Sequence, residues 1–242
     1  MNNHRTFEQF GEHGVLISWP SKIDPSINEE VLKMDASVTA IFSEEIIETV
    51  PAYHSLAVYL KSTVVVTEFI AKLKKISSTS VKIDLRKTFK VTIPVCYDIE
   101  FAPDMEEVAT IHDITVDEVI KIHTEPFYKV YFLGFLPGFP YLGGLSEKLN
   151  TPRKKTVRKF VEKGSVAIGG NQTGIYTMES PGGWNIIGRS PLLFFSTSKG
   201  VNSLLNPGDF VKFTPVSLEE FNDIKREIEL GNYEVKKEVR ND

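Results

Sequence analysis

The sequence predicts an α+β protein in which an N-terminal ferredoxin-like βαββαβ domain precedes a C-terminal β-barrel. Near residue 86 the hydrophobic pattern changes from strands that alternate with helices to short strands separated by Gly and Pro. Eleven of the 16 glycines then fall between Gly134 and Gly188, interleaved with aromatic residues. Glycine permits tight turns and close backbone approach, so this block predicts shaped loops around a site rather than a linker. We therefore expect two domains, residues 1–86 and 87–242.

The first domain is predicted from four apolar runs of strand length and two helical segments. The strands are expected at 15–19, 46–50, 56–60 and 81–85. Asp24 can cap a helix that begins at Pro25 and runs to about Phe42, and a second helix is expected from Val64 to about Ile76. The order of strand, helix, strand, strand, helix and strand is the split βαβ pattern, in which helices cover one face of an antiparallel sheet.

The second domain is predicted to be rich in strands. Short apolar segments separated by Gly and Pro are expected to form them, at 91–97, 128–133, 165–168, 184–187, 192–195 and 209–213. Such a pattern is typical of a closed or nearly closed barrel. Helices are expected at 104–112, 116–124 and 217–230. Thr115 with Glu118, and Ser217 with Glu220, form the capping boxes that open the last two helices.

The composition favours a globular protein of the cytoplasm. A net charge of −4 and a pI near 5.8 carry no overall electrostatic signature of nucleic-acid binding. The N-terminal residues show no signal-peptide pattern, and no apolar run approaches the roughly 20 residues of a membrane span. Cys96 is the only cysteine, so no intrachain disulfide can form. We expect a cytoplasmic localisation, with neither nucleic acid nor membrane as a partner.

Four motifs carry a resemblance to a known family. They read GFLPGFPYLGGL from Gly134, TPRKKTVR from Thr151, GSVAIGGNQTGIY from Gly164 and SPGGWNIIGRSP from Ser180. Together they resemble the carboxyltransferase subdomain C and D family, which includes the B subunit of 5-oxoprolinase, the kinase inhibitor KipI and allophanate hydrolase subunit 1. The resemblance covers roughly residues 7–216. It implies that the barrel is cyclophilin-like.

The resemblance also implies an activity that the chain does not perform alone. In 5-oxoprolinase, the B subunit works with the homologous C subunit and with the A subunit, and the complex opens 5-oxoproline to glutamate at the expense of ATP. We therefore expect ATP with Mg to act in the complex, and no cofactor to be bound tightly to this chain. Two alternatives stay open: a KipI-like protein-interaction role that inhibits a histidine kinase, and a carboxyltransferase component that acts on urea or a related amide.

The candidates for catalysis are Arg153, Gln172, Tyr176 and His123. Arg153 coincides with the family's Pro-Arg motif, and its guanidinium suits bidentate recognition of a carboxylate or a phosphate. Gln172 and Tyr176 occupy a glycine-rich turn whose backbone N–H groups could face a bound group. His123 ends a predicted helix, where it can act as a general acid or base or serve as a helix cap.

Further residues are expected to bind substrate or to remain on the surface. The substrate-binding candidates are Arg158, Arg189, Phe139, Tyr141 and Gly170. Phe139 and Tyr141, together with Phe135, fit a pocket wall or core better than chemistry. The lysines at 154, 155, 159 and 163 are expected to form a solvated face. No metal site is expected, because the histidines form no metal-binding motif. The sequence has neither a Gly-Lys-Ser/Thr phosphate loop nor a nucleophile elbow, which argues against independent ATP binding and against covalent catalysis.

Overall fold

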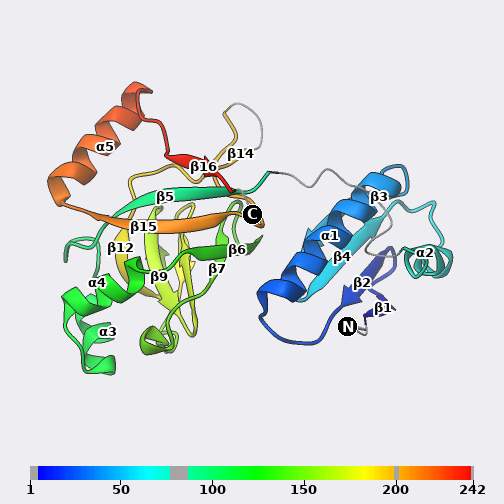
Figure 1. The fold of residues 1–242 in the computed structure, drawn as a ribbon, viewed down its shortest axis with the longest axis horizontal. Coiled ribbons are helices and arrows are strands. Elements are labelled where there is room, and N and C mark those ends of the chain that lie inside the picture. The colour runs from blue at the N-terminus through cyan, green and yellow to red at the C-terminus, as the bar shows by residue number, and fades with distance from the viewer. Residues whose placement is uncertain (1–4, 77–86, 199–201, 241–242) are drawn as a thin grey trace. The chain divides into compact units, whose positions relative to one another are not determined.

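The computed structural model describes residues 5–76, 87–198 and 202–240. The chain divides into two compact units, Met1–Lys87 and Thr88–Asp242, each of which is described by itself (Figure 1). Within the described ranges, no helix is both long and apolar enough to cross a membrane. We predicted two independently folding domains, residues 1–86 and 87–242. Whether each unit folds by itself stays a prediction.

The first unit contains a four-stranded antiparallel sheet and two helices. In chain order its elements are β1 (Thr6–Gln9), β2 (Gly14–Ser18), α1 (Pro25–Ile41), β3 (Ile46–Pro51), β4 (Ser55–Leu60) and α2 (Val66–Leu73). The strands lie in the order β1-β2-β4-β3. Helix α1 begins as predicted, because Asp24 accepts the Ser26 N–H at 2.8 Å and proline occupies the first turn. Met34 of α1 and Phe69 of α2 belong to the same core as Ile17 of the sheet.

This unit contains only part of the predicted βαββαβ pattern among its described residues. Strands β2, β3 and β4 correspond to the first three predicted strands, whereas the fourth, 81–85, lies outside the described residues. Strand β1 was not predicted. It pairs with the outer edge of β2, from Thr6 opposite Ser18 to Gln9 opposite Val15, and its residues are mostly exposed. A four-residue edge strand with one apolar residue, Phe7, has no alternating pattern that would reveal it. The ferredoxin-like assignment stays a prediction.

The second unit is a closed β-barrel. Its strands are β5 (Phe89–Cys96), β6 (Tyr128–Leu133), β7 (Pro140–Gly143), β9 (Ser165–Gly169), β10 (Gln172–Ile175), β12 (Asn185–Arg189) and β15 (Phe210–Val216). Around the barrel they follow the order β12-β9-β10-β7-β6-β15-β5, and pairing of Arg189 with Cys96 closes the ring. Strands β15 and β5 run parallel, and β16 (Lys237–Val239) adds to β5. A closed barrel is consistent with the cyclophilin-like architecture that the family implies.

Helices and short ribbons accompany the barrel. They are α3 (Met105–His112), α4 (Val116–Thr124), the 3₁₀ turn η1 (Glu147–Leu149), α5 (Leu218–Leu230) and the two-stranded pairs β8 (Arg158–Val161) with β11 (Ser180–Gly182) and β13 (Phe195–Ser196) with β14 (Asn202–Ser203). Both predicted capping boxes are present. The predicted strand at 192–195 is wrong, because a strand begins only at Phe195. Leu192 and Phe194 are apolar because they fill the barrel core, not because they lie in a strand.

Strand β9 explains why glycines and aromatic residues alternate in this sequence. Ile168 belongs to the core inside the barrel, whereas its neighbour Ala167 belongs to a separate apolar cluster that contains Trp184. Successive residues of a strand point to opposite faces, so this second cluster lies on the outer face of the barrel wall. A Cβ at Gly169 would lie 2.6 Å from the Trp184 ring. Glycine at this position lets the indole lie directly on the wall.

Candidate functional site

A pocket lined mainly by aromatic rings lies on this outer face. Its volume is about 320 Å³, and its wall consists of Phe135, Phe139, Tyr141, Arg153, Lys154, Val157, Tyr176, Pro181, Gly182, Gly183 and Trp184. The buried Phe139 ring packs edge-to-face with Tyr176 and Trp184, at centroid separations of 5.5 Å and 5.8 Å. Such packing fixes each ring against its neighbour. The pocket therefore has preformed, flat apolar walls.

Arg153 supplies an available positive charge to this pocket. Its guanidinium carbon lies 5.6 Å from the centroid of the Trp184 ring, which is a cation–π contact. The side chain is exposed, and no carboxylate in the part of the chain that the structure describes forms an ion pair with it. Its planar set of N–H donors can therefore receive a carboxylate or a phosphate that enters the pocket.

The two tyrosines of the pocket keep their protons. Burial raises the pKa of Tyr141 and of Tyr176 above the ordinary value, although the positive charge of Arg153 acts in the opposite direction. The Tyr176 hydroxyl also accepts a hydrogen bond from the backbone of Trp184. Both phenols are therefore neutral near neutral pH, and they can orient a ligand by hydrogen bonding rather than remove a proton from it.

A second pocket shares Arg153 and Lys154 with the first. Its volume is about 370 Å³, and its wall consists of Glu107, Ile111, Pro152, Arg153, Lys154, Lys155, Thr156 and Asn185. Lys155, which was expected only to form part of a solvated face, thus lines a pocket beside Arg153. The segment 152–157 therefore borders an aromatic compartment and a more cationic one, and Arg153 can serve either.

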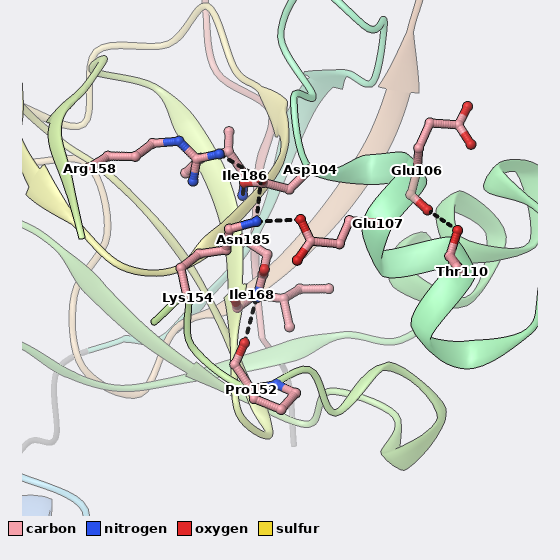
Figure 2. Close-up of polar contacts among 10 residues, drawn as sticks. All are labelled: Asp104, Glu106, Glu107, Thr110, Pro152, Lys154, Arg158, Ile168, Asn185 and Ile186. Atoms are coloured by element: carbon pink, nitrogen blue, oxygen red, sulfur yellow. Dashed lines mark hydrogen bonds and ion pairs between the residues drawn. The ribbon is translucent and has the colours of Figure 1, made fainter. Parts of the chain in front are cut away.

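Buried Asp104 anchors this basic segment (Figure 2). The residue is 2% exposed, and its Oδ1 accepts hydrogen bonds from Lys154 Nζ at 3.0 Å and from Arg158 Nη2 at 2.5 Å. Its Oδ2 accepts the Ile186 N–H at 2.7 Å. Burial acts to raise the pKa of Asp104, but the hydrogen bonds from Arg158, Ile186 and Lys154 outweigh it, so this pKa lies below its ordinary value. The carboxylate stays charged and ties the basic segment to β12 and to the start of α3.

These contacts change the interpretation of the basic run. Lys154 pairs with both Asp104 and Glu107, so the expectation of a solvated lysine is wrong at this position. Arg158, a predicted substrate-binding residue, directs Nη2 to Asp104. Sequence reasoning missed Asp104 because an acidic residue after a proline suggested only the start of a helix. Its side chain makes no capping hydrogen bond to α3.

Arg189 lies at a different place from the aromatic pocket. Its guanidinium pairs with Glu162 at 2.6 Å and lies over the Phe101 ring at 4.6 Å. It lines a separate cavity of about 490 Å³, to which α5 also contributes. The prediction that Arg189 binds the same substrate as Arg153 therefore receives no support from their positions.

Two other candidates lie in the β9–β10 hairpin. Gly170 has a φ of +66°, donates its N–H to the Thr151 carbonyl at 2.7 Å and accepts the Thr151 N–H at 3.2 Å. Gln172 pairs with Gly169 across the hairpin. Neither Gly170 nor Gln172 lines the two pockets described above. Gly170 thus holds Thr151, the residue before Pro152 and Arg153, through an isolated β-bridge that engages both of its backbone groups.

His123 lies fully buried in the barrel interior. Tyr97 Oη lies 2.9 Å from its Nδ1, and Thr173 Oγ1 lies 2.9 Å from its Nε2. Because Thr173 Oγ1 donates its own hydrogen to the Ala167 carbonyl at 3.1 Å, it accepts from Nε2–H, and Nδ1 accepts from Tyr97. Burial lowers the pKa of His123 to about 3. A neutral ring with both nitrogens engaged argues for a structural role rather than for acid–base catalysis.

Comparisons with known proteins agree with the motifs of this site. The model of the carboxyltransferase domain, subdomain C and D, matches residues 5–205. The B subunit of 5-oxoprolinase from Bacillus subtilis (strain 168) is 38% identical over 232 residues, which are 91% of this chain and 96% of that protein. A conserved uncharacterized protein from Pyrococcus horikoshii is 44% identical, with a TM-score of 0.53 over 89% of this chain and 100% of its own. The K. lactis urea amidolyase, at 18% identity and a TM-score of 0.80, shares the fold over 98% of this chain and 16% of its own.

Proposed function

Because this chain belongs to the carboxyltransferase domain family, subdomain C and D, we propose that it is the B subunit of an ATP-dependent 5-oxoprolinase. The complex would open 5-oxoproline to glutamate, with the homologous C subunit and the A subunit as partners. The similarity to the 5-oxoprolinase B subunit over nearly the whole length of both chains supports this proposal. The K. lactis structure supports the fold alone. The urea amidolyases of Lachancea kluyveri and Saccharomyces cerevisiae are 31% and 30% identical, but over only 56% and 54% of this chain and 8% of their own length, so a role in urea chemistry has weaker support.

The observation that carries the proposal is the guanidinium of Arg153, which lies beside the rings of the aromatic pocket and forms no ion pair with any described carboxylate. 5-oxoproline combines a small ring with a carboxylate, and these are the two features that flat apolar walls and a guanidinium recognise. Arg153 would hold the carboxylate, or an anionic oxygen that develops during the reaction, and Tyr176 would orient the ring by a hydrogen bond. Asp104 holds the segment in which Arg153 lies, so it positions Arg153 without contacting substrate.

The residues of this chain fit an anionic group better than they fit a magnesium ion. Arg153, Lys155 and Thr156 line the second pocket and are the side chains that would contact an oxygen of a phosphoryl group. Among the described residues, no group of three or more His, Cys, Asp or Glu side chains is arranged to hold a metal ion. ATP would supply the free energy for lactam opening, and we assign the binding of its metal ion to the partner subunits.

The proposal is tested by glutamate release from the assembled complex. Co-expressed with its A and C subunits, the chain is expected to convert 5-oxoproline to glutamate when ATP is present. The purified chain alone is expected to release none. Turnover by the isolated chain would contradict the division of labour within the complex. A stable complex without turnover would instead favour a protein-interaction role, such as the inhibition of a histidine kinase.

We further propose that the two units are independently folded domains, ferredoxin-like for residues 1–86 and cyclophilin-like for residues 87–242, and that the complex acts in the cytoplasm. The compactness of each unit supports the first statement, and a lone buried Cys96 thiol suits a reducing compartment. Limited proteolysis is expected to release a stable fragment that begins near residue 87. Cleavage only within 134–188 would contradict the two-domain proposal.

A further inference from the structure

Phe135 combines two unfavourable features at the mouth of the aromatic pocket. Within the described residues, the non-glycine residues with positive φ are Asp113, at 52°, and Phe135, at 66°. Asp113 is the C-cap of α3, a position where the left-handed conformation is common. Phe135 has no such cap to explain it, and bulky side chains adopt this conformation rarely. The residue is also 62% exposed, so a large apolar side chain remains in water.

The turn around Phe135 is fixed by several contacts. Gly134 N–H donates to the Phe139 carbonyl at 3.1 Å, and Phe139 N–H donates to the Leu136 carbonyl at 3.0 Å. Thr177 Oγ1 donates to the Pro137 carbonyl at 2.7 Å. These bonds hold the backbone in its strained conformation, which aims the Phe135 side chain at the pocket. Strain that the surroundings maintain at a pocket is a sign of a functional position.

The Phe135 ring forms one wall of the aromatic pocket. The ring stands perpendicular to Phe139, with an interplanar angle of 90° and a centroid separation of 5.5 Å, and it lines the same pocket as Arg153. We propose that Phe135 is a specificity-determining wall that packs against the face of a small ring whose anionic group Arg153 holds. The exposed apolar surface becomes buried when the ligand binds, and a preformed wall avoids the entropic cost of ordering a loop.

The test compares alanine and glycine variants at the two positions with positive φ, Phe135 and Asp113. It rests on the proposed function, because it measures the KM for 5-oxoproline. In the complex with the A and C subunits, Phe135→Ala and Phe135→Gly are expected to raise the KM for 5-oxoproline roughly tenfold, with kcat changed by less than about twofold. Phe135→Tyr, which keeps the ring, should stay close to the wild type. The matched controls are Asp113→Ala, which retains the strain of positive φ, and Asp113→Gly, which relieves it. Asp113 lines neither pocket, so both controls should leave KM unchanged. At both positions the glycine variant should melt about 2 to 4 °C above the alanine variant, because only alanine is strained there.

Each outcome distinguishes this inference from the proposed function. A wild-type complex that assembles but releases no glutamate overturns the proposed function and the inference with it. An active wild type whose KM is unchanged in Phe135→Ala overturns the inference alone. Loss of co-purification with the partner subunits in the Phe135 variants would also overturn it, because Phe135 would then be an interface residue.

Discussion

The polar side chains of the barrel interior and of the outer pocket differ in whether they have partners, as His123 and Arg153 show. Each nitrogen of His123 has a fixed partner, and burial keeps the ring neutral. Arg153 is exposed and has no carboxylate partner among the described residues, while its neighbours Lys154 and Arg158 are both held by Asp104. Both His123 and Arg153 were candidates for catalysis on sequence grounds. The comparison shows that the partners of a polar residue, rather than its type, decide whether it can do chemistry.

Among the substitutions that test this difference, His123→Ala is expected to cause the largest loss of stability. The substitution leaves a cavity in the barrel and removes the hydrogen-bond partners of Tyr97 and Thr173. We expect the free energy of unfolding to fall by about 4 kcal/mol, and the melting temperature by roughly 10 °C. Thermal unfolding measures both quantities, and the folded variant should retain its turnover at low temperature. Loss of turnover with unchanged stability would contradict the structural role.

Asp104→Asn is expected to affect stability and activity together. Removing the charge leaves Lys154 and Arg158 without their buried partner, which costs about 3 kcal/mol of stability. The segment that contains Arg153 also loses its anchor, so glutamate release by the complex should fall. Glu106→Gln, an exposed change on the same helix, is the control and should change neither property. A stable, fully active Asp104→Asn variant would show that Arg153 needs no such anchor.

Arg153→Lys is expected to lower activity without lowering stability. Lysine keeps the charge but loses the planar pair of donors, and one charge-assisted hydrogen bond in the transition state is worth roughly 2 kcal/mol, or about thirtyfold in rate. Glutamate release and circular dichroism measure the two properties. Lys159→Ala serves as the control, because Lys159 is exposed and lines neither pocket at the site. Equal turnover by Arg153→Lys and the wild type would show that the reaction does not need the guanidinium of Arg153.

The pH dependence of stability provides a separate test of the barrel interior. Below the ordinary His pKa of 6.5 the unfolded chain binds a proton that folded His123 does not bind until about pH 3. Stability is therefore lost as the pH falls through this window. Between pH 7 and pH 5 the free energy of unfolding should fall by about 2 kcal/mol from this residue. Urea unfolding at both pH values measures the change, and the loss should be smaller by that amount in His123→Gln. If His123→Gln lost as much stability as the wild type between pH 7 and pH 5, the loss would come from titratable groups other than His123.

The parts of the fold that local chemistry determines were predictable. The caps of α1, α4 and α5 and the position of the glycine-rich block follow from side chains that act within a few residues. Strand β1 was missed because it is four residues long with Phe7 as its one apolar residue, too short for a recognisable alternation, and pairing with β2 makes it a strand. The strand expected at 192–195 failed for the converse reason, since apolar residues there fill the core without pairing.

The candidate site was predictable as a region but not as a set of contacts. The motifs led to Arg153, Tyr176, Phe139 and Tyr141, which the structure brings together in one pocket. Asp104 and Arg158 lie 54 residues apart, and no local pattern indicates that they meet. The division of one basic run into paired and unpaired cations depends on that long-range contact. The sequence separated Arg153 from Arg158 only through the family's Pro-Arg motif, and it gave no sign that Asp104 pairs with Arg158.

The smallest effect is expected at Gly170, beside the pocket but outside its wall. An added Cβ meets no atom within 4 Å, so alanine fits, but the φ of +66° makes it strained by roughly 1 kcal/mol. The hydrogen bonds to Thr151 remain, so Gly170→Ala should melt slightly lower and release glutamate at the normal rate. Gly169→Ala is the contrasting variant, because its Cβ would lie 2.6 Å from Trp184 and displace the ring that Arg153 contacts. That variant should lose activity. If Gly170→Ala lost turnover while keeping its melting temperature, the site would extend into the hairpin, and Gly170 would bind substrate as the sequence predicts.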